Sequence, residues 1–224
     1  MDLAILVNII KETDKNWRFV FESPLYDEIN FISGQFIQLA IPDEHDKTYF
    51  HKRNYSVASW PDKTNRFELI ITYLKGGKFS EWLFKEAKIG SEVYYKGPLG
   101  VFTLPGDLTQ REITMVSTGS GISPFRSMMN YIYENKVPFK KINFIFGTRF
   151  ETDLLYREEL EKFDRELENF HFLPALSRED KEGFTRGYVH DVYLPMLEQQ
   201  DENPLFYLCG WNIMVSETRK NLER

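Results

Sequence analysis

The side chains best suited to chemistry surround a glycine-containing turn at residues 118–122, between an apolar run and a helical pattern. Gly119 and Gly121 let the backbone turn sharply and let a ligand come close, because neither carries a Cβ. Ser123 suits a helix N-cap and Pro124 the first helical position. The free amides and the dipole of a helix start favour a phosphate there. A tight turn without a ligand explains this stretch equally well, and Pro124 stands where the dinucleotide-binding fingerprint has a third glycine.

The run 53–59 in the first half also carries side chains that suit a nucleotide. On a strand, Arg53 and Tyr55 point to one face and Ser56 to the other. Arginine can hold a phosphate with two hydrogen bonds, and a tyrosine ring can lie against a flat ligand. The serine hydroxyl can bond to a ring nitrogen. An edge strand with a surface arginine and a half-buried tyrosine is the alternative interpretation.

Cys209 is the only cysteine in the sequence, so the chain can build neither a disulfide framework nor a cysteine-ligated iron–sulfur cluster. It precedes Gly210 at the end of an apolar run, where parallel sheets bind ligands. An inert buried thiol is the alternative. For Trp211, the next residue, we predict packing in the core. The four histidines have no metal-ligand spacing, and we predict no metal site.

The composition of the 224 residues limits the classes of function. A formal net charge of −6 argues against nucleic acid as a partner. With 42% hydrophobic and 28% charged residues, the chain has the balance of a globular protein. No apolar run approaches the ~20 residues of a membrane helix, and the first residues lack the features of a signal peptide. We therefore expect a cytoplasmic protein without membrane insertion.

Short β-rich runs separated by turn residues make up the first half and predict an antiparallel barrel. We expect strands at 17–22, 36–41, 67–74 and 92–96, and a short helix at 79–88. From residue 107 on, apolar strands alternate with helices, which is typical of a parallel sheet covered on both faces. We expect strands at 113–117, 141–147, 170–176 and 205–209, and helices from Pro124, from Thr152, at 190–199 and from Asn212. The pattern predicts two domains, 1–107 and 108–224.

Several short motifs follow one another along nearly the whole chain. They are Arg53-x-Tyr55-Ser56, Gly77-x-x-Ser80, Gly97-Pro98-x-Gly100-x-Phe102, Thr118-Gly119-x-Gly121-Ile122-x-Pro124, Gly147-Thr148-Arg149 with Asp153-Leu154-Leu155-Tyr156, and Cys209-Gly210. Each motif alone is common, but their ordered combination resembles the ferredoxin–NADP reductase superfamily of flavoproteins. The resemblance implies an N-terminal six-stranded barrel that binds FAD and a C-terminal α/β domain that binds NAD(P).

The resemblance also implies roles for residues of the first domain. The arginine matching Arg53 pairs with the flavin phosphates, and the tyrosine matching Tyr55 packs on the isoalloxazine. The serine matching Ser56 bonds near the flavin N5, which accepts the hydride, and we assign Ser56 a catalytic place. The turn whose amides and serine hydroxyl hold the pyrophosphate matches Gly77, Lys78, Phe79 and Ser80. A strand that contacts FAD further out matches Ile71 and Thr72.

In the second domain, the resemblance implies a site for the pyrophosphate and nicotinamide of the pyridine nucleotide. It matches the opening turn with Thr118, Gly119, Gly121 and Pro124, and the pair Cys209 and Gly210. The family's cysteine lies beside the nicotinamide. We expect Cys209 to act by position, helping to hold the nicotinamide C4 over N5, and not as a nucleophile, since hydride transfer depends on positioning.

Ser177 and Arg178 follow the apolar run 170–176, where NADP-dependent members hold the 2′-phosphate with a serine and an arginine. An exposed loop arginine is the alternative, and NADH-using relatives can carry the same pair. The neighbouring charges have opposite effects. Glu179 and Asp180 would repel a 2′-phosphate, whereas Lys181 and Arg186 would attract it. We favour NADPH over NADH.

The prediction is an FAD-dependent NAD(P)H oxidoreductase that passes hydride from nicotinamide to flavin and electrons to a separate acceptor. Ferredoxin or flavodoxin is the expected acceptor. Alternatives are the reductase component of an oxygenase, a free flavin or quinone reductase, and, from another class, a non-catalytic nucleotide-responsive regulatory or electron-transfer subunit. In many members a further strand and an aromatic residue cover the flavin, whereas this sequence stops at Arg224.

Overall fold

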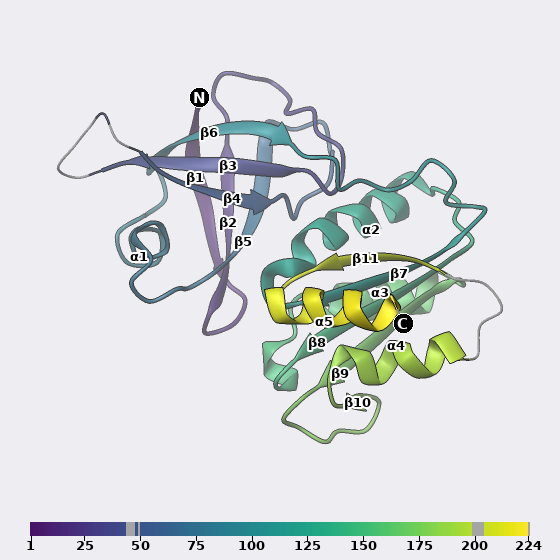
Figure 1. Cartoon of the computed structure of the whole chain (residues 1–224). Coiled ribbons are helices and arrows are strands. Elements are labelled where there is room, and N and C mark those ends of the chain that lie inside the picture. The colour runs from purple at the N-terminus through teal and green to yellow at the C-terminus, as the bar shows by residue number, and fades with distance from the viewer. Residues whose placement is uncertain (44–47, 49, 199–203, 224) are drawn as a thin grey trace. The chain divides into compact units, whose positions relative to one another are not determined.

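The computed structural model describes residues 1–43, 48, 50–198 and 204–223. The chain forms two compact units (Figure 1), Met1–Leu104 with Ser123–Glu134, and Pro105–Ile122 with Asn135–Arg224. Segment 123–134, which the sequence pattern assigns to the second half, groups with the first unit. The division at residue 107 stays a prediction.

The first unit is built on a six-stranded antiparallel sheet in the order β4-β3-β6-β1-β2-β5. Its strands are β1 (Asp2–Lys11), β2 (Asn16–Glu22), β3 (Phe36–Pro42), β4 (Phe50–Ser56), β5 (Arg66–Thr72) and β6 (Glu92–Leu99). An antiparallel bridge between Val57 and Leu69 joins the end of β4 to β5, so the two outer strands of the order also meet. The predicted six-stranded FAD-domain fold is confirmed, although β1 is absent from the strands that the sequence pattern identified.

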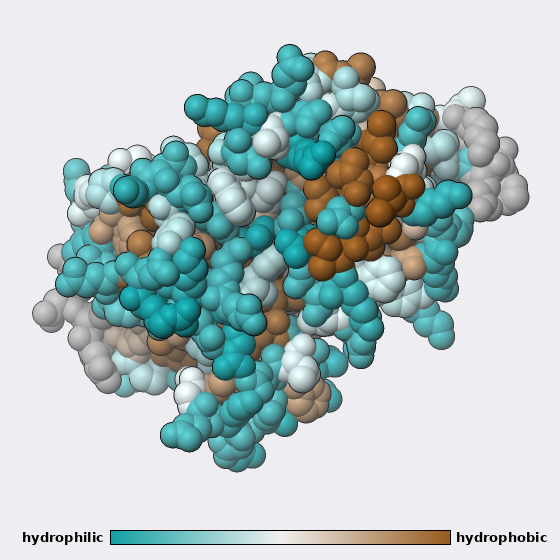
Figure 2. Space-filling model, turned by 180° about the vertical axis from the view of Figure 1, so that it is seen from behind, coloured by the Kyte–Doolittle hydropathy of each residue, from teal (hydrophilic) through white to brown (hydrophobic). Residues whose placement is uncertain are grey.

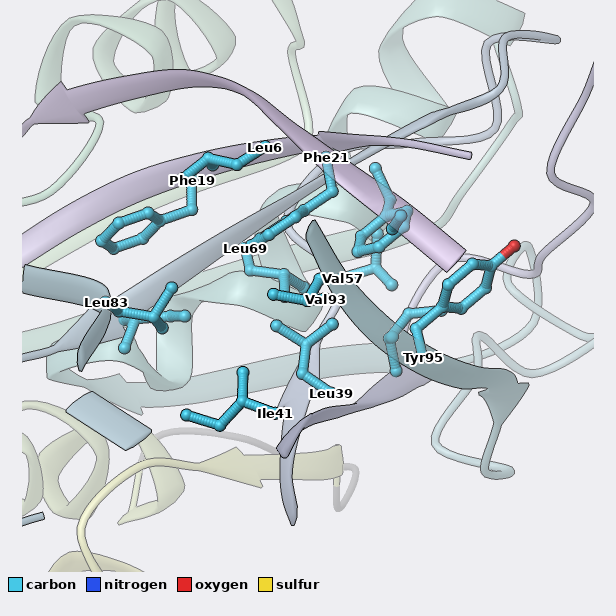
Figure 3. Packing of buried hydrophobic residues seen from close by; sticks show 14 of the residues in the cluster. Leu6, Phe19, Phe21, Leu39, Ile41, Val57, Leu69, Leu83, Val93 and Tyr95 are labelled. Atoms are coloured by element: carbon cyan, nitrogen blue, oxygen red, sulfur yellow. The ribbon is translucent and has the colours of Figure 1, made fainter. Parts of the chain in front are cut away.

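The core of the first unit comes from the alternation of side chains along these strands. Phe19 and Phe21 on β2 and Leu39 on β3 are fully buried and lie among apolar side chains of the other strands (Figure 3). Helix α1 (Lys78–Lys85) adds Phe79 and Leu83 to the same cluster. Each such side chain contributes about 1.5–3 kcal/mol through burial, which fixes α1 and the turn before it.

Helix α2 (Ser123–Asn135) belongs to the first unit through a buried arginine. Arg126 is 5% exposed, and its guanidinium donates to the Ala58 carbonyl at 2.9 Å. It also pairs with the Glu68 carboxylate at 2.6 Å and lies over the Trp60 ring, 5.6 Å from its centroid. These contacts attach the helix to the segment that directly follows β4 and to β5.

The second unit holds a five-stranded parallel sheet in the order β10-β9-β8-β7-β11. Its strands are β7 (Glu112–Thr118), β8 (Lys141–Thr148), β9 (Phe170–Leu176), β10 (Thr185–Arg186) and β11 (Leu205–Cys209). Helices α4 (Val189–Glu198) and α5 (Asn212–Leu222) share a buried cluster with β7, β8 and β9 (Figure 1), while α3 (Arg157–Glu166) packs Phe163 against Phe170 of β9. The predicted α/β fold is confirmed.

Two local predictions differ from the structure. The helix expected from Thr152 begins at Arg157, because a short 3₁₀ turn (Glu151–Asp153) comes first and Tyr156 takes a left-handed conformation with φ 54°. Strand β10 is too short for the sequence pattern to reveal. Of the helix expected at 190–199, Gln199 lies outside the described residues.

The surface seen in Figure 2 is mostly hydrophilic, with a patch of apolar residues. Single exposed apolar side chains are normal on a protein surface and do not by themselves identify a site. None of the helices in the described ranges has the length and apolar character that a membrane crossing requires.

Candidate functional site

The three predicted flavin residues of β4 lie side by side on one strand. Arg53 and Tyr55 pair with Leu39 and Ile37, two fully buried residues of β3. Tyr55 is half-buried with its ring 5.9 Å from that of Phe79, and burial raises the pKa of its phenol. The Arg53 side chain is exposed and donates one hydrogen bond, at 2.7 Å, to the carbonyl of its neighbour Lys52. Its other guanidinium nitrogens can therefore serve a phosphate.

Ser56 ends β4, opposite Phe36 of β3, and is partly exposed. The chain closes onto β5 at the next residue, Val57. The backbone of Ser56 is thus held by β3 on one side and by the bridge of Val57 to β5 at the next residue. Its hydroxyl therefore has a defined position from which it can form a hydrogen bond to a ligand.

The turn before α1 has the properties of an anion site. Gly77 is the N-cap of α1, and no side-chain hydrogen bond caps the helix. The first amides of a helix have no partner within the helix, so those of Lys78 and Phe79 can serve a ligand. The Phe79 side chain itself is buried in the core, and the Lys78 ammonium lies 3.5 Å from Asp43.

The hydroxyl of Ser80 already has two partners. It accepts from the Leu74 amide at 2.7 Å and donates to the Leu74 carbonyl at 3.0 Å. Because the single hydroxyl proton is engaged, the side chain has none to donate to a phosphate. Ser80 therefore shapes the turn in this structure, and the pyrophosphate contact expected of its hydroxyl stays a prediction.

The side chains of Ile71 and Thr72 contact other groups of the barrel. The Ile71 side chain is 1% exposed and belongs to the barrel core. The Thr72 hydroxyl donates to the Asn16 side-chain oxygen at 2.6 Å. The expected FAD contact of these two residues stays a prediction.

In the second unit, the predicted nucleotide residues of two distant segments meet at the carboxyl ends of neighbouring strands. Strands β7 and β11 are parallel, with Ser117 opposite Cys209. A Cβ added to Gly121 would lie 2.3 Å from the Cys209 carbonyl oxygen, and one added to Gly210 would lie 2.3 Å from the Thr118 Oγ1. Both glycines are therefore required by close backbone approach.

The 3₁₀ turn Gly119–Ile122 leads directly into α2, which begins at Ser123 with Pro124, both buried, in its first turn. The helix starts one residue before the predicted position. Proline suits this turn because the first amides of a helix are unpaired within it.

Cys209 is half-buried, and burial raises the pKa of its thiol to about 11. The thiol is therefore neutral at physiological pH. A neutral thiol is a poor nucleophile, which agrees with the expected role in positioning.

Trp211 is not a core residue, and the prediction of core packing is wrong. Its side chain is 62% exposed, because the residue precedes α5 as its N-cap and only its backbone is held. The backbone amide donates to the Thr118 hydroxyl at 3.0 Å. The local sequence cannot reveal this, because the contact spans 93 positions.

Ser177 and Arg178 lie where β9 ends beside β8. The Ser177 amide and hydroxyl both donate to the Thr148 carbonyl, at 2.9 and 3.2 Å, and the Arg178 amide donates to the Arg149 carbonyl at 3.0 Å. The side chains of Arg149 and Arg178 are exposed. Within the described ranges neither guanidinium forms an ion pair.

The acidic residues near Arg178 are already paired with other groups. Glu151 forms ion pairs with Lys181 and Arg157, which lower the pKa of its carboxyl, and Glu179 accepts from the Glu151 amide at 2.8 Å. Asp180 lies 3.4 Å from Arg186. Lys181 is thus engaged elsewhere, which weakens its expected role toward a 2′-phosphate.

Tyr188, an exposed aromatic residue near this loop, is not among the site residues predicted from the sequence. Tyr188 is 62% exposed and stacks on His190 with ring centroids 5.5 Å apart. The Gly187 amide before it donates to the Leu176 carbonyl, at the end of β9.

No group of histidine, cysteine or carboxylate side chains in the described residues has the geometry of a metal site.

Comparisons with known proteins agree with this arrangement. Residues 4–104 match the oxidoreductase FAD-binding domain family, and residues 115–220 match the oxidoreductase NAD-binding domain family. Ferredoxin–NADP reductase B from Sorangium cellulosum is 32% identical over 197 residues, which are 85% of this chain and 78% of that protein. The electron transfer component of anthranilate 1,2-dioxygenase from Acinetobacter baylyi is 26% identical over 196 residues, 88% of this chain and 55% of that protein.

Among solved structures, the fold matches a ferredoxin NADP+ reductase from Neisseria gonorrhoeae with bound FAD and NADP, with a TM-score of 0.83 and 22% identity. That match covers 99% of this chain and 89% of the other. The Amycolatopsis cytochrome P450 reductase GcoB matches with a TM-score of 0.86 and 23% identity, over 100% of this chain and 66% of the other.

The chain belongs to the ferredoxin–NADP reductase family of oxidoreductases, flavoproteins with an FAD-binding and an NAD-binding domain. It spans about half the length of the anthranilate dioxygenase component and 42% of the reductase component of propane 2-monooxygenase from Gordonia.

Proposed function

We propose that the protein is an FAD-dependent NAD(P)H reductase that delivers electrons to a separate acceptor. The cluster of Thr118, Gly121, Cys209 and Gly210 at the ends of β7 and β11 carries the proposal, because its two glycines let these strand ends approach closely at the carboxyl edge of the parallel sheet, where such sheets bind ligands. When bound, the pyridine nucleotide supplies a hydride and FAD the ring that accepts it. The protein's task is to bind and orient the two, since such a transfer needs positioning more than acid–base groups.

For FAD, the residues of β4 and the start of α1 have suitable chemistry. We assign the free guanidinium nitrogens of Arg53 and the uncapped amides of Lys78 and Phe79 to the phosphates. The Tyr55 ring supplies an aromatic face held in place by its packing on Phe79, and Ser56 supplies a hydroxyl for the flavin ring. A Cβ on Gly77 would lie 3.2 Å from the Leu74 carbonyl oxygen, so a glycine suits this tight turn before the assigned amides.

For the pyridine nucleotide, we assign the pyrophosphate to the turn of Thr118, Gly119 and Gly121 before Pro124. We place the nicotinamide beside Cys209 and Gly210. The neutral thiol of Cys209 contributes bulk and polarity without reacting, in keeping with the raised pKa of this group.

We propose NADPH as the preferred coenzyme. A 2′-phosphate carries negative charge and three oxygens, and exposed arginine side chains free of ion pairs bind such a group well. Arg178 and Arg149 present two such guanidiniums on adjacent strand ends, while Glu151 and Asp180 are held by other basic groups. The Ser177 hydroxyl donates its proton to the Thr148 carbonyl. It can therefore only accept a hydrogen bond from a ligand, unless the hydroxyl rotates away from Thr148 and donates to the 2′-phosphate.

Replacing Arg178 by Ala tests the coenzyme preference. We expect KM for NADPH to rise roughly tenfold or more, because a hydrogen bond to a charged group is lost, while KM for NADH stays unchanged. The control is Arg165→Ala, which removes an exposed arginine of α3. An equal effect on both coenzymes, or none, contradicts the assignment of Arg178.

As electron acceptor we propose ferredoxin or flavodoxin. The single cysteine leaves this chain without the thiolates for an iron–sulfur cluster, so the acceptor lies outside it. The likeness to ferredoxin–NADP reductase B supports this choice, and the likeness to oxygenase electron transfer and reductase components supports an oxygenase partner as the second candidate.

The decisive experiment is a visible absorption spectrum of the purified protein, followed by anaerobic addition of NADPH and then of each acceptor. We expect flavin bands that NADPH bleaches and that ferredoxin or flavodoxin restores. Recovery only with free flavin or a quinone would favour those acceptors instead. Failure to bind flavin even after incubation with FAD would exclude the reductase function and leave the regulatory subunit as the alternative.

A further inference from the structure

Trp211 directly follows Gly210 of the cluster at the ends of β7 and β11, and the proposed function leaves its side chain without a role. Trp17, Trp60 and Trp82 are half-buried, whereas Trp211 is 62% exposed. Large aromatic surface in water is unfavourable, and the indole carries a polar N–H beside its apolar ring. Trp211 contacts Thr118 and Gly119, which belong to the turn assigned to the pyrophosphate.

The backbone holds this indole beside the turn. The Trp211 amide donates to the Thr118 Oγ1 at 3.0 Å, and its carbonyl accepts the Val215 amide of α5 at 3.1 Å. Gly210, with φ 151°, lets the chain turn directly from β11 into this position. The side chain therefore starts from a fixed point on the rim of the turn.

The nitrogen-bearing edge of the indole lies along Gly119. A Cβ on Gly119 would be 3.1 Å from the Trp211 Nε1 and 3.9 Å from its Cδ1. Gly119 has φ 55° and no side chain, so nothing separates the indole from the backbone of the turn. The atoms of the six-membered ring of Trp211 are not among those nearest to this Cβ position of Gly119.

An indole Nε1–H is a donor and never an acceptor. Across the described parts of the chain, no protein acceptor lies within hydrogen-bond distance of this donor. The uncharged turn at the start of α2 attracts an anion through its amides, and the Trp211 Nε1–H adds a further donor beside Gly119 of that turn.

We propose that Trp211 binds the pyrophosphate of the pyridine nucleotide by donating its Nε1–H to a phosphate oxygen. The inference rests on the proposed function and adds to it a binding residue common to both coenzymes. NADPH and NADH share the pyrophosphate, so Trp211 supports both equally, whereas Arg178 distinguishes them.

The experiment measures dissociation constants by calorimetry on the oxidised, FAD-loaded protein at pH 8. The ligands are NADP+, NAD+, ADP-ribose, which keeps the pyrophosphate without the nicotinamide, and 2′-AMP, which has no pyrophosphate. The variant Trp211→Phe keeps an aromatic ring and removes the N–H. Trp211→His restores a ring N–H, and Ile213→Ala, a 70% exposed residue of the same helix, is the matched control.

For Trp211→Phe we expect roughly tenfold weaker binding of NADP+, NAD+ and ADP-ribose, and unchanged binding of 2′-AMP, because a hydrogen bond to a charged group is lost. The His variant should recover part of the affinity, and Ile213→Ala should match the wild type. If the Phe variant does not load FAD, Trp211→Leu, which removes both the ring and the N–H, is compared with Trp211→His, which keeps a ring and an N–H.

Unchanged binding of ADP-ribose by Trp211→Phe would overturn the inference. So would a loss confined to the nicotinamide-bearing ligands, since the ring and not the N–H would then make the contact. A wild-type protein that binds none of the four ligands would instead refute the proposed function, so the two failures are distinguishable.

Discussion

At the scale of single residues, hydrogen bonding determines which of the candidate side chains remain available to a ligand. The Ser80 hydroxyl, which the resemblance assigns to the pyrophosphate, donates to the Leu74 carbonyl, and the Thr72 hydroxyl donates to Asn16. Among the residues that the structure describes, Arg53 and Arg178 keep guanidinium nitrogens without protein acceptors, as a phosphate site requires. The same type of residue thus serves structure in one place and can serve a ligand in another.

Cys209 offers a prediction about protonation. With a thiol pKa of about 11 raised by burial, the thiolate is on the order of one part in a thousand at pH 8, so alkylation by iodoacetamide should be slow there. The rate should climb tenfold per pH unit up to about pH 11, and mass spectrometry of the alkylated protein follows it. A rate that levels off near the ordinary thiol pKa of about 8.5 would show that burial does not shift this group.

At the scale of elements, the candidate site residues lie at the ends of strands and the starts of helices. Strand β4 ends at Ser56, where Val57 closes onto β5, and β7 and β11 end at Thr118 and Cys209. Helix α2, which follows the nucleotide turn, is attached to the first unit by Arg126, whose partners Ala58 and Glu68 lie on either side of a turn after β4. A buried ion pair of this kind is costly to break, because one charge is left without its partner.

The ion pair of Arg126 and Glu68 provides a prediction about stability. Arg126→Leu should lower the free energy of unfolding by about 3 kcal/mol, the lower end for a buried pair, because Arg18 remains 3.2 Å from Glu68. Replacing both residues by Leu should cost less than the sum of the single changes. Urea unfolding of the four proteins measures this double-mutant cycle.

The control for this cycle is Arg111→Leu, which breaks an i,i+4 pair with Asp107 at the surface. That change should stay within about 1 kcal/mol. Additive effects of the two core substitutions would mean that Arg126 and Glu68 do not interact in solution.

At the scale of the whole molecule, the chain has two compact units and matches one FAD-binding and one NAD-binding domain family. The first unit holds the residues assigned to FAD, and the second holds those assigned to the pyridine nucleotide except Pro124, which lies in segment 123–134 of the first unit. A ligand that binds only the folded state stabilises the unit that holds it.

Added FAD should therefore raise the melting temperature of the protein, by an amount equivalent to about 2.7 kcal/mol when FAD is at a hundred times its Kd. Scanning calorimetry of the apoprotein with increasing FAD measures the shift. Arg53→Ala should lose much of it, whereas Arg66→Ala, which removes an exposed arginine of β5, should keep it. An Arg53 variant with the full shift would rule out a phosphate contact for this residue.

The sequence by itself determined the class of fold, the ordered motifs and most strands, because alternation, glycine turns and helix starts depend on a few neighbouring residues. It also identified Thr118, Gly121, Cys209 and Gly210, which the structure brings together. Only the tertiary structure decided which hydroxyls are already bonded, that Ile71 faces the core, and that Trp211 is exposed beside Gly119. These facts depend on partners far away in the chain, such as Thr118 for Trp211, and no local pattern contains them.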